Sequence, residues 1–258
     1  MTQEKTNVDL NPVSTVNEPV IEIKELYKSF GTNEVLKGVN LTVKKGENLV
    51  ILGKSGSGKS ITIKCIVGLM GIDKGEIKVF GSDITKMDNS ELNKIRVRIG
   101  FLFQNAALYD SMSVRENLGF TLKRHAKDLT AEEVENQIKE ILESVGLSEA
   151  IDKMPSELSG GMRKRIGLAR TLILKPEIIL YDEPTTGLDT ITSREISELV
   201  LEIQKKYKTS SIIITHDMAC AKHTSDRLMI LKDGIIHAEG AYDELEKSDD
   251  EWVRSFFI

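Results

Sequence analysis

The chain has 258 residues, of which 40% are hydrophobic and 29% are charged, and its formal net charge is −5. These values are ordinary for a globular protein with a buried core, and the acidic balance argues against general nucleic-acid binding. No apolar run approaches the roughly 20 residues of a membrane span, so we expect a cytoplasmic chain that meets a membrane through a partner. Cys65 and Cys220 fall in no ligand spacing and predict no zinc site.

Residues 1–19 are polar and predict a flexible N-terminal tail, followed by one domain over 20–258. Residues 20–30 alternate as a strand does, and residues 34–53 indicate two more strands joined by the turn KKGE. The second of these ends in NLVIL and Gly53, and a stretch of helical character follows from residue 60. Strand, glycine loop and helix in this order are the context of a phosphate-binding loop.

The loop reads GKSGSGKS and matches the pattern GxxxxGK[ST] in full. Its glycines let successive backbone N–H groups turn toward phosphate oxygens, and the start of a helix adds favourable partial charge. The Lys59 ammonium would reach the β- and γ-phosphates, and the Ser60 hydroxyl would hold Mg²⁺. The predicted ATP-binding residues of the loop are Gly53, Lys54, Ser55, Gly56, Ser57, Gly58, Lys59 and Ser60.

A helical subdomain is expected over about 105–160, inserted into an α/β core. It follows a strand-like stretch, IGFLFQ, that ends in Gln104, whose amide could bind Mg²⁺ or water. Within the insertion, residues 129–147 have the marks of a helix, with Thr130 as N-cap, Glu133 at the capping-box position and Gly146 at the end.

A second glycine pair occurs in LSGGMRKR at 158–165, directly before a helical stretch. This pattern is typical of a backbone that approaches an anion at the start of a helix. The basic run at 163–165 either supports that anion or solvates the beginning of the helix.

The core then resumes, because the apolar runs at 177–180 and 211–215 lack alternation, as buried strands of a parallel sheet do. Asp182 ends the first run and suits the shell of Mg²⁺, and Glu183 beside it could polarise an attacking water. His216 follows the second run and could hydrogen-bond a γ-phosphate. The predicted catalytic residues are Glu183, His216, Gln104 and Lys59, and the predicted Mg²⁺ ligands are Ser60, Gln104 and Asp182.

The ordered set of these motifs resembles that of ATP-binding-cassette (ABC) ATPases over roughly 20–245. The resemblance implies a P-loop NTPase of α/β class, in which a RecA-like core carries an antiparallel β-subdomain and an inserted helical subdomain. It implies ATP hydrolysis with Mg²⁺, Phe30 stacked on adenine with Tyr27 as the alternative, Gln104 in the Q-loop, Glu183 as catalytic glutamate and His216 as switch histidine.

The same resemblance implies that the second glycine pair acts on a partner chain. Ser159, Gly160 and Gly161 would cap the γ-phosphate of ATP held by the opposite cassette of a homodimer, and Asp189 would lie beside them in the D-loop. An integral-membrane permease would dock near Gln104, which places the chain peripherally on the cytoplasmic face of the inner membrane. The apolar residues offered there are Ala106, Ala107, Leu108, Tyr109 and Met112, with the core of the helical subdomain as their alternative use.

Finer motifs resemble the ATPases of Mla-type phospholipid transporters, which work with an MCE-domain lipid-binding protein. They include LSGGM, in which Met162 replaces the glutamine of most ABC signatures, and the closing WVRSFF. The alternatives are an ABC system for another cargo, such as a small-solute importer or a lipoprotein or lipopolysaccharide exporter, and a non-transport ABC ATPase.

Overall fold

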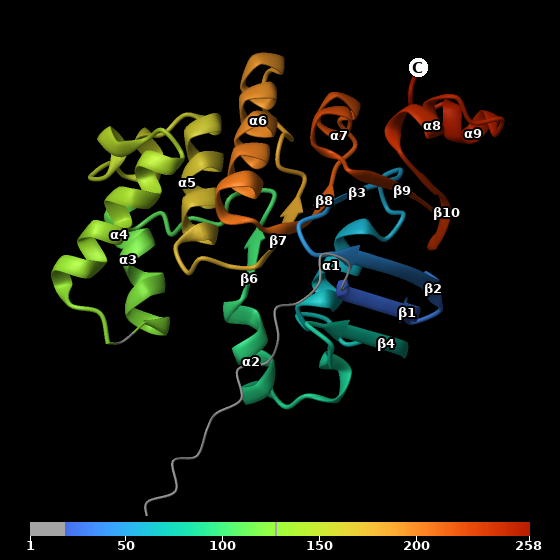
Figure 1. Ribbon diagram of the computed structural model, residues 1–258, viewed down its shortest axis with the longest axis horizontal. Coiled ribbons are helices and arrows are strands. Elements are labelled where there is room, and N and C mark those ends of the chain that lie inside the picture. Colours follow the sequence, from blue (N-terminus) through green and yellow to red (C-terminus); the bar gives the residue numbers. More distant parts are fainter. Residues whose placement is uncertain (1–18, 127) are drawn as a thin grey trace, which may run out of the picture.

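Two β-sheets organise the structure, a computed structural model that describes residues 19–126 and 128–258 (Figure 1). The tail expected over 1–19 lies outside the described residues except for Pro19, which begins the first strand.

The smaller sheet is antiparallel and has the order β2–β1–β4–β5. Strands β1 and β2 pair from Pro19 with Lys44 to Phe30 with Asn33, so this edge is a long hairpin. The alternation expected over 20–30 is confirmed at Ile21 and Ile23, which are buried. The strand bounds are β1 Pro19–Phe30, β2 Asn33–Lys44, β4 Lys74–Val79 and β5 Ser82–Asp83.

The larger sheet has the order β10–β9–β3–β8–β7–β6, and all of its neighbouring pairs are parallel except β10 with β9. Strands β3, β7 and β8 are buried at every residue, which confirms the parallel sheet expected from their apolar runs. The bounds are β3 Asn48–Leu52, β6 Ile99–Leu102, β7 Ile178–Asp182, β8 Ser210–Ile214, β9 Arg227–Lys232 and β10 Ile235–Gly240.

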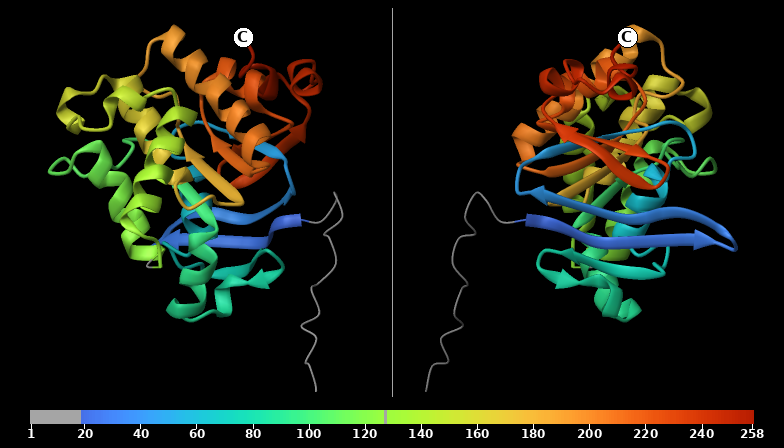
Figure 2. Two further views of the ribbon diagram at one scale, coloured as in Figure 1. Left: turned by 60° about the vertical axis from the view of Figure 1, so that its left-hand side comes forward. Right: turned by 90° about the vertical axis from the view of Figure 1, so that its right-hand side faces the viewer.

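Apolar cores cover both faces of the larger sheet. Leu49 and Ile51 of β3 pack in one core with the smaller sheet, whereas Val50 and Leu52 pack in the other with the helices of the opposite face. Figure 2 shows the smaller sheet lying across one side of the larger one. The helix bounds are α1 Lys59–Ile66, α2 Asn89–Val97, α3 Val114–His125, α4 Ala131–Ser144, α5 Gly160–Leu172, α6 Thr190–Tyr207, α7 Met218–Thr224, α8 Tyr242–Glu246 and α9 Glu251–Arg254.

Helices α3 and α4 lie beside α5 at one side of the molecule, within the range expected to be a helical insertion (Figure 1). The predicted capping box of α4 is confirmed: the Thr130 hydroxyl accepts from the Glu133 N–H, and the Glu133 carboxylate accepts from the Thr130 N–H at 2.7 Å. Short 3-10 turns at Ser148–Ala150 and Pro155–Glu157 lead from α4 to α5. Among the described residues, no helix is both long and apolar enough to cross a bilayer.

Candidate nucleotide-binding site

The phosphate loop lies where β3 ends and α1 begins, at the carboxyl edge of the parallel strands. This edge is where α/β sheets bind their ligands. Gly56 and Gly58 have φ of 79° and 108°, in the region that favours glycine. A Cβ on Gly53 would meet the Leu231 carbonyl oxygen at 2.5 Å, so the loop also needs glycine for close approach to the end of β9.

The Lys59 ammonium is buried inside this loop. Its Nζ donates to the carbonyl oxygens of Gly53 at 2.7 Å and of Lys54 at 3.2 Å. Burial lowers the pKa of Lys59, and the negative charges of Glu183 and Asp182 oppose that shift. A phosphate in this loop would offer the ammonium a charged acceptor in place of the two carbonyl oxygens.

Ser60 and Asp182 meet directly, although 122 positions separate them in the chain. The Ser60 hydroxyl donates to Oδ1 of Asp182 at 2.8 Å, which places two oxygen ligands side by side at the ends of β7 and the loop. The described residues contain no group of three or more His, Cys, Asp or Glu side chains that could hold a metal. Mg²⁺ fits this sparse donor set, because it binds through one or two protein ligands together with substrate phosphates and water.

Glu183 is held at each of its polar groups. Its N–H donates to the Ile214 carbonyl at 2.9 Å, and its carboxylate accepts from Nδ1 of His216 at 2.7 Å and from the Thr186 hydroxyl at 3.0 Å. Its φ of 54° lies in the left-handed region, which costs a non-glycine residue roughly 1–2 kcal/mol. This backbone conformation holds the fixed carboxylate beside the phosphate loop, as expected for the role predicted for Glu183.

One cavity of about 820 Å³ brings most of the predicted residues together. Gln104, Glu183 and His216 line it with the phosphate loop. Phe30 lies outside this lining with 48% of its surface exposed, and so does Tyr27. The lining residues are Val35, Gly53, Lys54, Ser55, Gly56, Ser57, Gly58, Lys59, Ser60, Ile61, Gln104, Glu183, His216, Ser255 and Phe256.

Four of these lining residues, Val35, Ile61, Ser255 and Phe256, were not predicted from the sequence. Ile61 follows the phosphate loop in α1. Val35 belongs to β2 of the smaller sheet, and Ser255 and Phe256 follow α9. Ser255 and Phe256 belong to the closing WVRSFF, which carries a family resemblance but predicts no place in the site. The signal that could find these residues is therefore their position in the fold.

The second glycine pair forms the first turn of α5. The Ser159 hydroxyl caps that helix by accepting from the Met162 N–H at 3.2 Å, and Ser159 and Gly160 are exposed. Neither they nor Gly161 line the cavity of the phosphate loop. Asp189 caps α6 in the same way, and its hydrogen bonds with Thr192 lower its pKa.

A model of the ABC transporter family matches residues 36–186, which is more than half of the chain. The chain belongs to this family. It is an ATPase cassette with the ABC fold, and it binds ATP.

Known proteins agree with this assignment. The chain is 39% identical over 236 residues to a probable ribonucleotide transport ATP-binding protein, mkl, of Mycobacterium leprae, covering 92% of this chain and 68% of that protein. It is 38% identical over 256 residues to protein TRIGALACTOSYLDIACYLGLYCEROL 3 of Arabidopsis thaliana, covering 93% and 74%.

Solved structures give the same result. A dimeric post-hydrolysis structure of the cassette MJ0796 with ADP and Pi matches with a TM-score of 0.78 at 33% identity, covering 86% of this chain and 98% of that one. A second match, cbiO1 from Clostridium perfringens, has a TM-score of 0.80 at 29% identity and covers 86% and 88%.

The three residues of the basic run at 163–165 do not act together, either in supporting an anion or in solvating the start of the helix. Arg163 donates to the Leu158 carbonyl, and Arg165 binds Glu195 and the Val145 carbonyl. Lys164 points inward instead, and its Nζ donates to the Glu183 carbonyl at 3.0 Å. The three neighbouring cations thus contact three different parts of the cassette.

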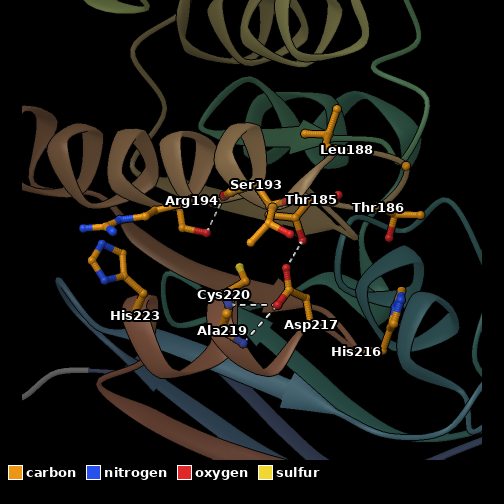
Figure 3. A pocket seen from close by; sticks show the side chains of 13 residues that line it. Thr185, Thr186, Leu188, Ser193, Arg194, His216, Asp217, Ala219, Cys220 and His223 are labelled. Carbon is orange, nitrogen blue, oxygen red and sulfur yellow. Dashed lines mark hydrogen bonds between the residues drawn. The ribbon is translucent and has the colours of Figure 1, made fainter.

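A further cavity of about 560 Å³ lies between α6 and α7 of the cassette, and His216 lines it as well as the nucleotide cavity. Figure 3 shows the Thr185 hydroxyl donating to Asp217, whose carboxylate also caps α7. The loop of His216 is thereby tied to the segment that follows Glu183.

Proposed function

We propose that two copies of this cassette close head to tail on two ATP molecules, hydrolyse them, and so drive phospholipid transport by an integral-membrane permease. The observation that carries the proposal is the separation of the two glycine loops. One lines a cavity with Gln104, Glu183 and His216, whereas Ser159 and Gly160 face outward at a helix start. In the proposal, one domain over 20–258 carries both the phosphate loop and the second glycine pair, and its helical subdomain spans about 105–160.

In this proposal the phosphate loop holds the triphosphate. The N–H groups of Gly53 to Ser60 surround phosphate oxygens, and Lys59 exchanges its two carbonyl partners for the β- and γ-phosphates. Ser60, Asp182 and Gln104 would hold Mg²⁺; the first two already meet, and Gln104 lines the same cavity as Ser60. When bound, the ion neutralises charge that develops on the phosphate oxygens.

Glu183 orients and polarises the attacking water, and His216 holds the Glu183 carboxylate in place. Their contact of 2.7 Å supports this division of work, because a base must be fixed within hydrogen-bond reach of its water. His216 is largely exposed, so it can also turn toward the γ-phosphate, as expected for a switch histidine.

Ser159, Gly160 and Gly161 bind the γ-phosphate on the partner's phosphate loop. Their placement at the start of a 13-residue helix supports this role, since such a start attracts an anion. Closure is then favoured only while both chains hold the same phosphate, and phosphate release reopens the dimer. Asp189 caps α6 beside the same surface.

The permease docks beside Gln104 on an aromatic surface made by Tyr109 and Phe120. These rings pack edge to face with centroids 5.3 Å apart, and they are 45% and 38% exposed. Arg170 donates to the Ala107 carbonyl beneath them. Ala106 is buried against α5 and Leu108 packs against the core, so they serve the alternative use considered for them.

Phospholipid is the proposed cargo, with an MCE-domain protein as a further partner on the far side of the permease. Support comes from LSGGM and the closing WVRSFF, and from a relative that is named after a glycolipid. Another cargo is the second candidate, because mkl is named for ribonucleotide transport. The proposed location is the cytoplasmic face of the inner membrane. Purifying the chain from membranes and identifying the bound subunits and lipids by mass spectrometry separates the two cargoes.

A mixing experiment tests the shared site. Ser159→Arg and Glu183→Gln chains should each be inactive alone. A mixed dimer contains one complete site, made by Glu183 of the first variant and the intact signature of the second. Mixing should therefore restore part of the phosphate release. A mixture as inactive as its components would overturn the proposal.

A further inference from the structure

Lys164 is a buried cation whose partner lies in another motif. Its side chain projects from α5 into the interior, the residue is 6% exposed, and Nζ donates to the Glu183 carbonyl at 3.0 Å. Burial lowers the pKa of Lys164, and the charges of Glu183 and Asp182 oppose that shift. The exposed Arg163 on the same turn has no such contact with Glu183.

Lys164 binds the backbone of Glu183, and the conformation of that backbone sets the direction in which the side chain leaves it. Glu183 has a left-handed backbone conformation, which persists only where the surroundings hold it. The Ile214 carbonyl fixes its N–H and Lys164 fixes its carbonyl, so the two hydrogen bonds hold both ends of the residue. Releasing one end would allow the backbone to relax and the carboxylate to move.

The helix that carries Lys164 is packed tightly against two further motif loops. A Cβ on Gly161 would meet Cγ2 of Thr192 at 2.5 Å, and a Cβ on Gly167 would meet the Ala106 Cβ at 2.7 Å. The first contact joins α5 to the segment after Asp189, and the second joins it to the segment after Gln104. Because interiors so closely packed move as units, a displacement of Ser159 at the start of α5 also displaces Lys164.

We propose that Lys164 is a positioning residue, which couples the seating of α5 on the partner's nucleotide to the orientation of the Glu183 carboxylate. This inference rests on the proposed function, in which Glu183 polarises water and Ser159 binds in trans. Lys164 itself does not line the cavity of the phosphate loop. Through Lys164, hydrolysis depends on the correct position of α5 on the partner's nucleotide.

The test compares Lys164→Met with Arg165→Met in the full chain. Both variants remove a cation from neighbouring positions of α5, but Arg165 binds Glu195 and Val145 and not Glu183. Lys164→Met should lower kcat roughly 10- to 100-fold, because small misplacements of a reacting group cost that much. Its KM for ATP and its Tm should stay close to those of Arg165→Met. Equal kcat values in the two variants, or a Tm loss that accounts for the fall, would overturn the inference.

Lys164→Gln keeps an N–H donor and replaces the methionine variant if that variant does not fold. The kcat of Lys164→Gln should lie between those of wild type and Lys164→Met. A double variant with Glu183→Gln gives a second readout. Lys164→Met should cause no further fall in single-turnover rate once the carboxylate is gone, since residues that act as a unit are not additive. Full additivity contradicts positioning.

The outcomes also separate the two proposals. If Glu183→Gln alone keeps wild-type turnover, the proposed role of Glu183 fails and the inference fails with it. If Glu183→Gln abolishes turnover while Lys164→Met keeps it, the role of Glu183 stands and the inference alone fails.

Discussion

The two glycine loops of the cassette use their glycines for different physical reasons. In the phosphate loop, Gly56 and Gly58 have left-handed φ, so glycine is needed for backbone conformation. In the signature, Gly160 and Gly161 lie in the first turn of a helix, and Gly161 is needed for space against Thr192. The same residue type therefore shapes a cradle at one position and permits close helix packing at the other.

The surroundings of the two loops differ as strongly as their glycines. The phosphate loop encloses a buried lysine and shares a cavity with three motif residues that each follow a strand, Gln104, Glu183 and His216. The signature presents an exposed serine and an exposed glycine on a helix end. The difference is what the proposed function requires: the first loop would bind ATP within one chain, and the second would form half of a site that a partner completes.

Glu183→Gln should have the largest effect. We expect turnover to fall about 10²- to 10⁴-fold, because the water loses its polarising carboxylate, while ATP binding persists. Both loops should then hold the same unhydrolysed phosphate, so size-exclusion chromatography with ATP should show a stable dimer. Undiminished phosphate release, or a monomer at saturating ATP, would contradict the different roles assigned to the two loops.

The next largest effect should be on ATP affinity, which distinguishes the phosphate loop from the signature. Lys59→Ala removes a charged donor worth about 1.5–3 kcal/mol, so the Kd for ATP of the single chain should rise roughly 10- to 100-fold. Ser159→Arg should leave that Kd near the wild-type value and still abolish hydrolysis. Fluorescent-nucleotide titration at low protein concentration measures both. Loss of binding in Ser159→Arg would place the signature in its own chain's site.

Gly161→Ala and Gly160→Ala form a matched pair within the signature. A methyl group at 161 would overlap Thr192, which should cost roughly 1–3 kcal/mol of unfolding free energy. A methyl group at 160 would lie 3.4 Å from Leu188, an ordinary contact, and should change stability by less than about 0.5 kcal/mol. Urea unfolding of both variants checks this order, and equal losses would contradict the packing argument.

Gly56→Ala tests the effect of backbone conformation alone in the phosphate loop. A Cβ there meets nothing within 4 Å, so the expected cost of roughly 1–2 kcal/mol comes from φ alone. Thermal unfolding should show a loss for Gly56→Ala that Gly160→Ala does not share, since Gly160 has no positive φ and a Cβ there makes only an ordinary contact. An unchanged Tm would show that the loop adopts another conformation.

Much of the fold could be predicted because its signals are local. The buried run of β3, the glycines after it and the capping box of α4 each lie within a few neighbouring residues. The order of the larger sheet could not be predicted, because β3 lies between β8 and β9, strands more than 150 residues later in the chain. Such pairings arise from packing on two faces rather than from local pattern.

The candidate site shows the same division. Glu183 and His216 could each be placed at a strand exit, and their contact follows because β7 and β8 are adjacent and parallel. Lys164 could not be distinguished from Arg163 and Arg165, since only the phase of α5 turns one of three cations inward. Phe30 remains a prediction, because the contact expected for it requires adenine.

The aromatic cluster after β10 has a practical consequence. The protein has one tryptophan, Trp252, whose ring lies 4.9 Å from that of Phe256, and Phe256 lines the nucleotide cavity. Lys232 and His237 also contact the indole, so its emission is sensitive to small shifts of charge and ring geometry. We therefore expect intrinsic fluorescence to change as nucleotide enters the cavity, which would follow binding in real time without a label.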